Sequence, residues 1–261
     1  MCLELKNPLF WKCKYCGEIY LYSEIEKNLF VCKNCGYHQP LTAENRIRYI
    51  VDENTFTEME QNLVSVAPFE FPDYEKKLKN SHMTTNMLEA VVTGIAKIKG
   101  VEVFLGVMDS RFIMGSMGIA VGEKIARLFD CARKDNKPVI LITASGGARM
   151  QEGVFSLFQM AKTSVAISQY KNSGGFFISV LTHPTTGGVS ASFAFLGDIV
   201  IAEPRAMIGF AGKRIIEQTT NEIMPDNFQT AEFWLERGYL DMLVDRKDLK
   251  QILGKLLLMH A

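Results

Sequence analysis

The hydrophobic pattern of the chain changes its period near residue 145. Residues 138–143 form an almost wholly apolar, β-branched run, which predicts a buried strand. After a turn that contains Gly146 and Gly147, apolar side chains recur at positions 154, 157, 158, 161 and 165. This spacing predicts an amphipathic helix. The chain is therefore expected to run from a buried strand, through two glycines, into a helix.

The same order of features occurs a second time. Residues 177–182 predict another buried strand, and Gly187 and Gly188 follow in a run of small residues, 185–194, that suits a tightly packed helix start. We call residues 145–149 the first glycine loop and residues 185–188 the second glycine loop. Glycine lets the backbone approach a ligand closely, and free N–H groups at a helix start favour negative charge. Two such loops facing one pocket suit carbonyl chemistry through an enolate, whose oxyanion needs stabilisation.

Strands and helices alternate around these loops. Residues 91–98 and 101–109 predict a hairpin, and the small-residue loop 113–118 leads into a helix over 120–133. This alternation predicts repeated ββα units with parallel strands. The other expected elements are short strands at 199–202 and 207–210, helices at 213–221 and 231–237, a short segment at 240–244, and a closing helix at 246–259 whose apolar stripe we expect to pack on its own domain.

The first 85 residues follow a different pattern. Thr42 is a candidate N-cap for a helix that starts near residue 43. Residues 52–85 are polar, with Pro68, Pro72 and scattered charges, and within them we expect short helices, including one near 74–80. We therefore divide the chain into a small unit at residues 9–40, a connecting segment at 41–85 and a main domain at 86–261.

Four cysteines give the strongest local signal. Cys13 and Cys16 are separated by two residues, as are Cys32 and Cys35, and fifteen residues lie between the pairs. This is the spacing of a four-cysteine zinc ribbon, and four protein ligands favour a structural rather than a catalytic metal ion. Glycines directly follow the second cysteine of each pair, where a positive φ is often needed. Disulfides or unrelated thiols are the alternatives.

Composition limits the classes of partner. The 261 residues include 29 basic and 29 acidic side chains, so the formal net charge is zero and no long-range field attracts nucleic acid or an acidic membrane. Residues 1–40 hold five lysines against four glutamates, which is no footprint for phosphate backbones. We find neither a signal peptide nor an apolar run of membrane-spanning length, and we expect a cytosolic protein.

Two other chemistries deserve comparison with the enolate hypothesis. Ser145 at a strand-to-helix turn, with His183 after the second strand, raises a serine hydrolase, although the loop lacks the Gly-x-Ser-x-Gly elbow. Glu152 and Asp198 lie near the glycine loops and could act as acid or base, but a helix first-turn acid and a strand-end acid are the commoner roles. Phosphate-loop and dinucleotide-binding glycine motifs are absent.

Several runs, in one order, resemble a known family. They are residues 145–152 (SGGARMQE), 160–164 (MAKTS), 184–194 (PTTGGVSASFA) and 208–212 (IGFAG). Together with the cysteine pattern before them, they closely resemble the β subunits of bacterial and plastid acetyl-CoA carboxylase carboxyltransferases. The resemblance extends from about Trp11 to Leu257. The chain departs from the family pattern at His183, where aspartate is expected, and at Met114, where glycine is expected.

The resemblance implies a fold, a reaction and partners. The fold is an α/β crotonase-like (ClpP/crotonase) ββα superhelix preceded by a small zinc ribbon with one structural Zn²⁺. The reaction moves a carboxyl group from biotin, held on a biotin carboxyl carrier protein, to acetyl-CoA, and it forms malonyl-CoA for fatty-acid biosynthesis. An α subunit completes the active site, typically in an α2β2 heterotetramer. The location is the cytoplasm, or the plastid stroma in a plastid-bearing source.

The resemblance also assigns the site residues. We expect the N–H groups of Gly146 and Gly147 to hold one oxyanion, and Gly187 and Gly188 to hold a second or to shape the pocket. Substrate binding is assigned to Ser145, Ala148, Arg149, Gly115 and Gly118. Arg149, Lys213 and Arg214 are candidates for the CoA phosphates. The remaining alternatives are a carboxyltransferase or decarboxylase for another acyl-CoA, and a zinc-ribbon nucleic-acid binder on an inactive scaffold.

Overall fold

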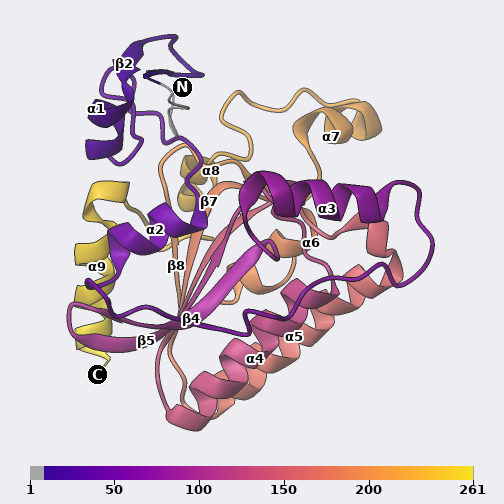
Figure 1. Cartoon of the computed structure of the whole chain (residues 1–261). Helices are drawn as coiled ribbons and strands as arrows, with labels where there is room; N and C mark the ends of the chain where they lie inside the picture. Colours follow the sequence, from indigo (N-terminus) through magenta and orange to yellow (C-terminus); the bar gives the residue numbers. More distant parts are fainter. Residues whose placement is uncertain (1–8, 261) are drawn as a thin grey trace, which may run out of the picture.

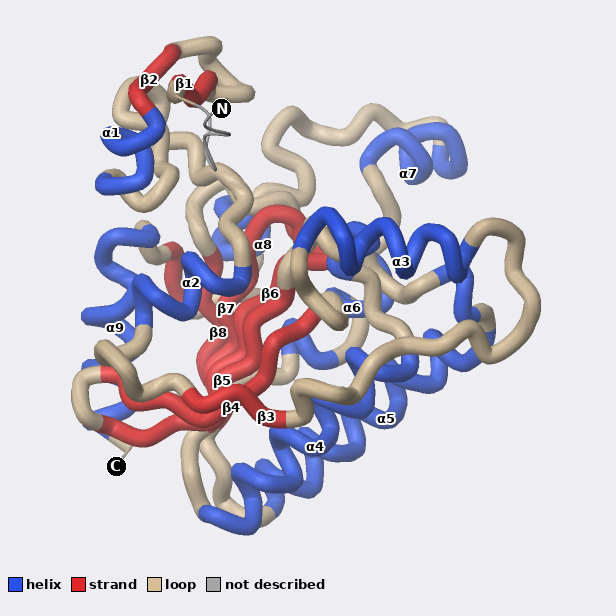
Figure 2. Tube along the Cα trace, in the orientation of Figure 1, coloured by secondary structure: helices blue, strands red, loops and turns tan. Residues whose placement is uncertain are grey.

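A sheet of eight strands forms the centre of the protein (Figures 1 and 2). The computed structural model describes residues 9–260, together with every side chain in that range except that of Arg214. The strand order is β10-β8-β7-β6-β5-β4-β3, and β9 pairs with the end of β7. Strands β5, β6, β7, β8 and β10 run parallel, whereas β3, β4 and β5 form an antiparallel meander.

The elements have the following bounds. The strands are β1 (Phe10–Lys12), β2 (Ile19–Leu21), β3 (Thr57–Met59), β4 (Val91–Ile98), β5 (Val101–Met108), β6 (Val139–Ser145), β7 (Phe177–Thr186), β8 (Ile199–Ala202), β9 (Ile208–Gly209) and β10 (Met242–Leu243). The helices are α1 (Tyr22–Lys27), α2 (Ala43–Ile50), α3 (Tyr74–Thr85), α4 (Ile119–Asp135), α5 (Val154–Asn172), α6 (Gly187–Ser190), α7 (Lys213–Thr220), α8 (Ala231–Glu236) and α9 (Arg246–Met259), with 3₁₀ turns at Ile113–Gly115, Met150–Glu152 and Phe193–Phe195.

Helices cover both faces of the sheet, as the apolar runs require. All seven residues of β6 are buried, which explains why its sequence does not alternate between apolar and polar positions. One hydrophobic core lies between the sheet and α4, and a second lies between the sheet and the α2 and α9 helices (Figure 1). The expected ββα alternation and α/β class are therefore confirmed. The stripe of α9 packs on its own domain, since Leu249, Leu253 and Leu257 are all buried.

The segment at residues 52–85 contains more structure than its polar sequence indicates. Thr57–Met59 form an edge strand, β3, that pairs with β4, and α3 continues to Thr85. A strand of three residues on a sheet edge is too short to produce a periodic pattern. The predicted cap is confirmed, because the Thr42 hydroxyl accepts a hydrogen bond from the N–H of Asn45 at 3.0 Å.

Helix α5 forms where it was expected, but its apolar stripe faces outward. Exposed positions include Val154, Phe155, Leu157, Phe158 and Val165, each at least 42% accessible. The buried side starts with small and polar residues and becomes apolar only towards the end of the helix, and α5 packs against α4. The positions that face inward are Ser156, Gln159, Thr163, Ala166, Ile167 and Tyr170. Helical spacing predicted the helix, but it did not predict which face would be buried.

The small N-terminal unit lies beside one end of the sheet (Figure 1). It consists of the β1–β2 hairpin, α1 and a core of Ile25, Phe30 and Leu41. None of the helices within residues 9–260 combines the length and apolar character needed to cross a bilayer.

Candidate functional site

The two glycine loops lie directly against each other. They follow the neighbouring parallel strands β6 and β7, whose register pairs Ser145 with Thr185. A methyl group added to Gly187 would lie 3.0 Å from Gly147 Cα, and one added to Gly147 would lie 3.1 Å from Gly187 Cα. Both glycines have positive φ, +117° at Gly147 and +60° at Gly187. The backbones of the two loops are in direct contact here, and a residue with a side chain would not fit at either position.

The N–H groups that we expected to act as donors are engaged within the chain. Gly146 N–H donates to the Met114 carbonyl at 2.8 Å, and Gly147 N–H donates to Ser145 Oγ at 3.0 Å. In the second loop, Gly187 N–H donates to the Phe210 carbonyl at 3.1 Å. The sequence could not reveal these bonds because their acceptors include residues 32 and 23 positions away.

The available donors lie one residue further along each loop. Ala148 N–H makes no hydrogen bond to any described part of the chain. Gly188 lies in the first turn of α6, where N–H groups have no carbonyl of a preceding helical turn. A methyl group added to Gly188 would lie 3.3 Å from Ala148 N, so the two N–H groups are close neighbours. This pair is suited to hold an oxygen that develops negative charge.

A short loop from residue 113 to 118 supports the first glycine loop. Met117 N–H donates to the Gly147 carbonyl, and Arg149 N–H donates to the Met117 carbonyl, both at 2.8 Å. Gly115 has φ +67°, and a side chain there would collide with the Ala144 carbonyl. A side chain at Gly118 would meet the Glu152 carboxylate. In this structure Gly115 and Gly118 therefore have packing roles, and substrate contact by either residue stays a prediction.

Arg149 is fully buried, so its guanidinium offers no surface to a CoA phosphate. It donates to Glu89 Oε1 at 2.5 Å and to Glu152 Oε1 at 3.2 Å. Burial raises the pKa of Glu89, but the Arg149 guanidinium outweighs this effect and holds that pKa below its usual value. The remaining partners of the guanidinium are Ser65 Oγ at 2.9 Å, the Ser116 carbonyl at 2.7 Å, Ser116 Oγ at 3.2 Å and Tyr74 Oη at 3.4 Å.

Glu152 and Asp198 have structural roles, which the sequence favoured over roles as acid or base. Glu152 is buried, and its Oε2 accepts a hydrogen bond from Ile119 N–H at 2.6 Å, which caps α4 from outside. Asp198 accepts from Phe177 N–H at 2.9 Å and pairs with Lys171 at 2.7 Å. Both carboxylates thus hold chain segments in place.

Ser145 and His183 do not form a nucleophile and base pair. Ser145 Oγ is occupied by Gly147 N–H, and His183 Nδ1 accepts a hydrogen bond from Met207 N–H at 3.2 Å. Burial lowers the pKa of His183, and its ring packs edge-on against Tyr37. Within residues 9–260 no hydrogen bond joins the two side chains, so the geometry does not support the hydrolase alternative.

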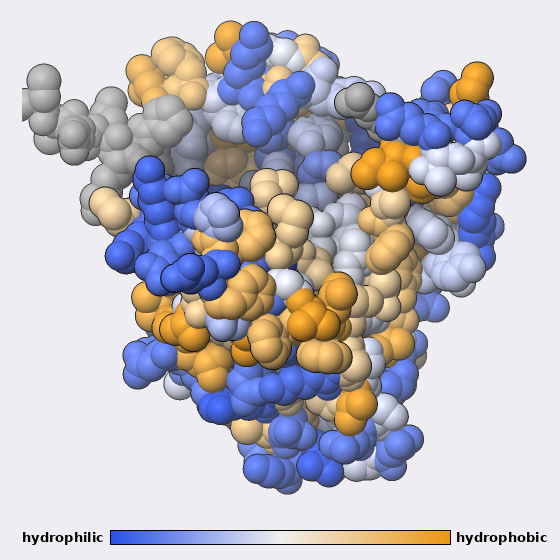
Figure 3. Space-filling view, turned by 90° about the vertical axis from the view of Figure 1, so that its right-hand side faces the viewer, coloured by the Kyte–Doolittle hydropathy of each residue, from blue (hydrophilic) through white to orange (hydrophobic). Residues whose placement is uncertain are grey.

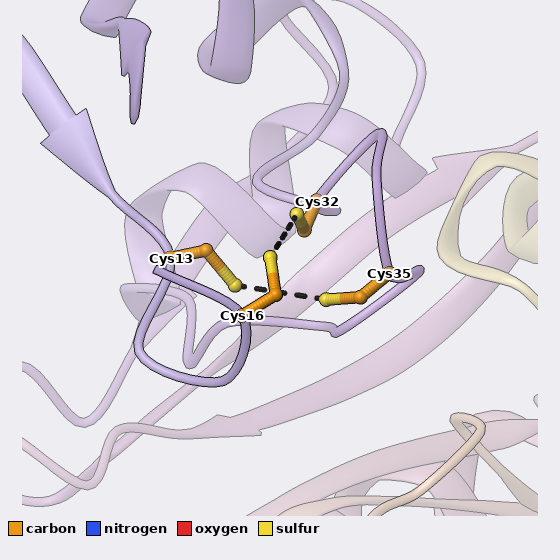
Figure 4. A group of neighbouring side chains, drawn as sticks. All are labelled: Cys13, Cys16, Cys32 and Cys35. Carbon is orange, nitrogen blue, oxygen red and sulfur yellow. Dashed lines mark hydrogen bonds between the residues drawn. The ribbon is translucent and has the colours of Figure 1, made fainter. Parts of the chain in front are cut away.

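Four cysteine side chains converge in the N-terminal unit (Figure 4). Their Sγ atoms all lie within 4.8 Å of one another, and the Cys13–Cys35 and Cys16–Cys32 separations are 3.7 and 3.6 Å. Tetrahedral zinc with bonds of about 2.3 Å to sulfur separates its ligands by about 3.8 Å, so this group fits such an ion. None of these four cysteines forms a disulfide.

The local backbone shapes both cysteine pairs and lowers the pKa of one of the four thiols. Gly17 and Gly36 have φ of +78° and +70°, as the sequence predicted for the two knuckles. Burial raises the pKa of the Cys32 thiol, but the N–H groups of Cys35 and Asn34 and the Tyr20 hydroxyl together lower it to about 6. A thiolate, which is the metal-binding form, is therefore favoured at Cys32.

A buried ionic cluster joins this unit to the end of β8. Glu203 Oε1 accepts from Arg46 Nη1 at 2.7 Å and from Arg246 Nε at 2.9 Å. Arg246 also donates to the carbonyls of Leu29 and Gln39, both at 2.8 Å, which belong to the N-terminal unit. These contacts fix the cysteine unit beside the strand that follows the second glycine loop.

The groove along α3 lies apart from the glycine loops. It has a volume of about 1120 Å³ and includes Lys76 and Lys79, but neither loop lines it. Lys213, a candidate for the CoA phosphates, donates to the Pro225 carbonyl at 3.1 Å. Arg214, the other candidate in α7, has its side chain outside the described residues. The CoA phosphate site thus stays a prediction.

Sequence reasoning missed the distant residues that support the first glycine loop. Ser65, Tyr74 and Glu89 all contact Arg149, from 60 to 84 positions earlier in the chain. The only signal for them was a lone arginine in a run of small residues that follows a buried strand. Such an arginine needs acidic partners if it is buried, but its sequence does not say where they are.

Comparison with known proteins gives a consistent assignment. The model of the family described as the carboxyl transferase domain matches residues 40–234. Transcarboxylase 12S, in a crystal structure with methylmalonyl-CoA and methylmalonic acid bound, is 26% identical with a TM-score of 0.73, over 84% of this chain and 41% of that chain. This chain therefore spans about two fifths of the transcarboxylase chain.

Two further structures share the fold. A chain of the Pseudomonas malonate decarboxylase hetero-dimer is 21% identical with a TM-score of 0.65, over 84% of this chain and 86% of that one. The β subunit of P. aeruginosa geranyl-CoA carboxylase is 19% identical with a TM-score of 0.67, over 91% of this chain and 40% of that chain. The crotonase-like α/β fold that the resemblance implied is confirmed. The family match spans well over half of the residues and both glycine loops, and the chain belongs to the carboxyl transferase domain family.

Proposed function

We propose that this protein is the β subunit of an acetyl-CoA carboxyltransferase, which forms malonyl-CoA with carboxyl groups from carboxybiotin. The observation that carries the proposal is the meeting of the two glycine loops, which brings together the N–H groups of Ala148 and Gly188 in a member of the carboxyl transferase family. The order of sequence motifs supports the acetyl-CoA form in particular. A carboxyltransferase or decarboxylase for another acyl-CoA is the alternative, favoured by the likeness to a transcarboxylase that binds methylmalonyl-CoA.

The contribution of the chain to catalysis is charge stabilisation. Removal of a proton from the acetyl methyl group places negative charge on the thioester oxygen, and the Ala148 and Gly188 N–H groups would donate to that oxygen. Each such donor contributes about 3 kcal/mol of transition-state stabilisation. Carboxybiotin on a carrier protein supplies the carboxyl group and, after release of CO₂, a basic nitrogen. Glu152 and Asp198 are already used structurally, which agrees with a mechanism that needs no side-chain base from this chain.

A partner subunit would cover the exposed stripe of α5. Hydrophobic residues gather near the middle of the face shown in Figure 3, which is the right-hand side of Figure 1, where α3 and α5 lie. The α5 residues on the surface include Val154, Phe155, Leu157 and Phe158, and they begin five residues after the first glycine loop. Apolar surface of this kind marks interaction sites. The malonate decarboxylase neighbours, which are a hetero-dimer and a hetero-tetramer, provide a precedent.

The metal of the cysteine unit is proposed to be a structural Zn²⁺. Four thiolates complete a tetrahedral shell and leave no open position for substrate. Its role would be to fold residues 9–40, a unit whose hydrophobic core is small.

The test combines the purified chain with a candidate α subunit. Malonyl-CoA-dependent carboxylation of biocytin, the reverse half-reaction, is followed for the mixture and for each subunit alone. Activity in the mixture only is the expected result. A well-formed complex without activity towards malonyl-CoA, but with activity towards another acyl-CoA, would support the alternative.

A pair of variants tests the partner surface. Phe158→Glu places a charge on the exposed stripe of α5 and is expected to weaken assembly at least tenfold, with the free energy of unfolding within about 0.5 kcal/mol of wild type. Leu258→Glu is the matched control, because Leu258 is equally exposed, 61% against 59%, but lies on α9 across the sheet. Equal assembly by both variants, measured by analytical ultracentrifugation, would exclude α5 as the contact.

A further inference from the structure

Arg149 stands out because it is a fully buried arginine directly beside the Ala148 N–H group. Stability alone does not explain these ion pairs, because replacing a whole buried ionic group by hydrophobic side chains of similar volume is often neutral or stabilising. What an ionic network does provide is directed hydrogen bonds that set the position of the atoms they join. The atoms joined by Arg149 lie around the first glycine loop.

The side chain and the backbone of Arg149 hold the same short bridge. The backbone N–H of Arg149 donates to the Met117 carbonyl, and Met117 N–H donates to the Gly147 carbonyl. Met117 therefore binds the residues on both sides of Ala148, and the Ala148 N–H is left on the opposite side, towards Gly188. The guanidinium meanwhile bonds the carbonyl of Ser116, the residue before Met117, at 2.7 Å.

The carboxylates fix the guanidinium itself. Glu89 lies two residues before the start of β4. Its Oε1 accepts a hydrogen bond from Arg149 Nη2 at 2.5 Å and another from Ala90 N–H at 2.8 Å. Glu152 connects the guanidinium to the first turn of α4 through Ile119 N–H. Arg149 is thus connected to a sheet strand and a long helix, which are rigid elements.

We propose that Arg149 is a positioning residue for the proposed reaction: its guanidinium, fixed by Glu89, holds the Met117–Ala148 bridge so that Ala148 N–H points at the substrate oxyanion. This inference rests on the proposed function for the identity of the oxyanion. It replaces a phosphate-binding role for the Arg149 side chain with an indirect role through the backbone.

The first experiment separates orientation from ground-state binding. Arg149→Lys keeps the charge but loses the planar, multiply bonded guanidinium. In the complex with the partner subunit, we expect kcat to fall about 10- to 100-fold with KM within about threefold, because the donor matters mainly for the transition state. A CoA analogue whose thioester is replaced by a methylene-linked carboxylate, a mimic of the enolate, should bind at least tenfold more weakly, while acetyl-CoA binds unchanged.

Matched variants address folding. Glu89→Gln, which keeps shape and loosens the guanidinium, should show the same pattern with a smaller effect. Tyr170→Phe is the control for a lost buried hydrogen bond far from the loop, since the Tyr170 hydroxyl lies 2.7 Å from the Lys137 carbonyl. The inference would be overturned if Arg149→Lys and Tyr170→Phe lost the same free energy of unfolding and also had the same kcat and KM.

The amide resonance of Ala148 gives a readout that does not depend on activity. In the isotope-labelled chain, Glu89→Gln, which leaves the sequence neighbours of Ala148 unchanged, is expected to shift the ¹H–¹⁵N signal of Ala148, while the signal of Gly174, a distant loop glycine, stays fixed. An unmoved Ala148 signal would also overturn the inference. If the wild-type complex binds neither CoA ligand, the proposed function fails, and the Ala148 signal still decides whether Arg149 positions this amide.

Discussion

The two glycine loops have similar sequences and similar places in the sheet, yet different parts of the molecule hold them. The first loop is supported from within the main domain by Arg149, Glu89 and the Met117 bridge. The second loop follows His183, whose ring packs on Tyr37 of the cysteine unit. Strand β7, which leads into this loop, pairs with β8, and the Glu203 cluster at the end of β8 binds the same unit. The geometry of the first loop is therefore expected to be independent of the metal, whereas that of the second is not.

Removal of a metal ligand should give the largest difference between the loops. In Cys32→Ala the chain is expected to lose its metal ion and, with it, on the order of 10 kcal/mol of stabilisation of residues 9–40. Hydrogen–deuterium exchange should then rise in residues 9–40 and around residues 183–188, but not around residues 145–149. Metal content is measured in parallel.

Cys131→Ala is the control, because this free cysteine lies outside the group of four. One zinc ion per chain in the Cys32→Ala protein would contradict the ligand set. Equal exchange increases in both loops would contradict their separate support.

The contact between the loops should be nearly as sensitive. Gly187→Ala introduces a methyl group 3.0 Å from Gly147 Cα, in addition to strain at φ +60°. We expect activity to fall about 100-fold, since small displacements in a site have effects of this size. Gly238→Ala measures the strain alone, because Gly238 also has positive φ, +74°, but nothing within 4 Å of its added methyl group.

Thermal unfolding and the biocytin assay are run on both variants. The positive φ costs each variant roughly 1 kcal/mol, and the close contact adds to this only in Gly187→Ala. Comparable activities of Gly187→Ala and Gly238→Ala would mean that activity does not depend on the close contact between the loops.

The pH dependence of stability should show the smallest effect. The native pKa of Glu89 lies below its value in the unfolded chain, so the unfolded state binds the proton more readily. The stabilisation is complete above about pH 4.5 and is lost as the pH falls through the native pKa. Glu89→Gln should flatten the decline of the free energy of unfolding below pH 5, as measured by urea unfolding.

Glu203→Gln provides the comparison at the second loop, because Arg246 and Arg46 outweigh burial and hold the pKa of Glu203 well below its usual value. It should flatten the same decline and also loosen residues 9–40, whereas Glu89→Gln should not. An identical slope for wild type and Glu89→Gln would mean that Arg149 contributes no net attraction.

Local patterns predicted most elements because their causes are local. The apolar run of β6, the hairpin of β4 and β5, and the cap at Thr42 all depend on residues within a few positions. The outward stripe of α5 and the edge strand β3 were not predictable in this way. Their environments depend on α4 and on β4, which are distant in sequence.

The sequence by itself determined the cysteine pairs, both strand–glycine–helix units and the family motifs, since fixed spacing and residue type suffice for each. Only the tertiary structure decided which N–H groups remain available. The N–H groups of Gly146 and Gly147 donate to the Met114 carbonyl and to Ser145 Oγ. The N–H group of Ala148 stays available because Met117 bonds the residues on either side of Ala148. The physical reason is that hydrogen bonds of a backbone loop are completed by whatever the packing of the whole sheet brings beside it.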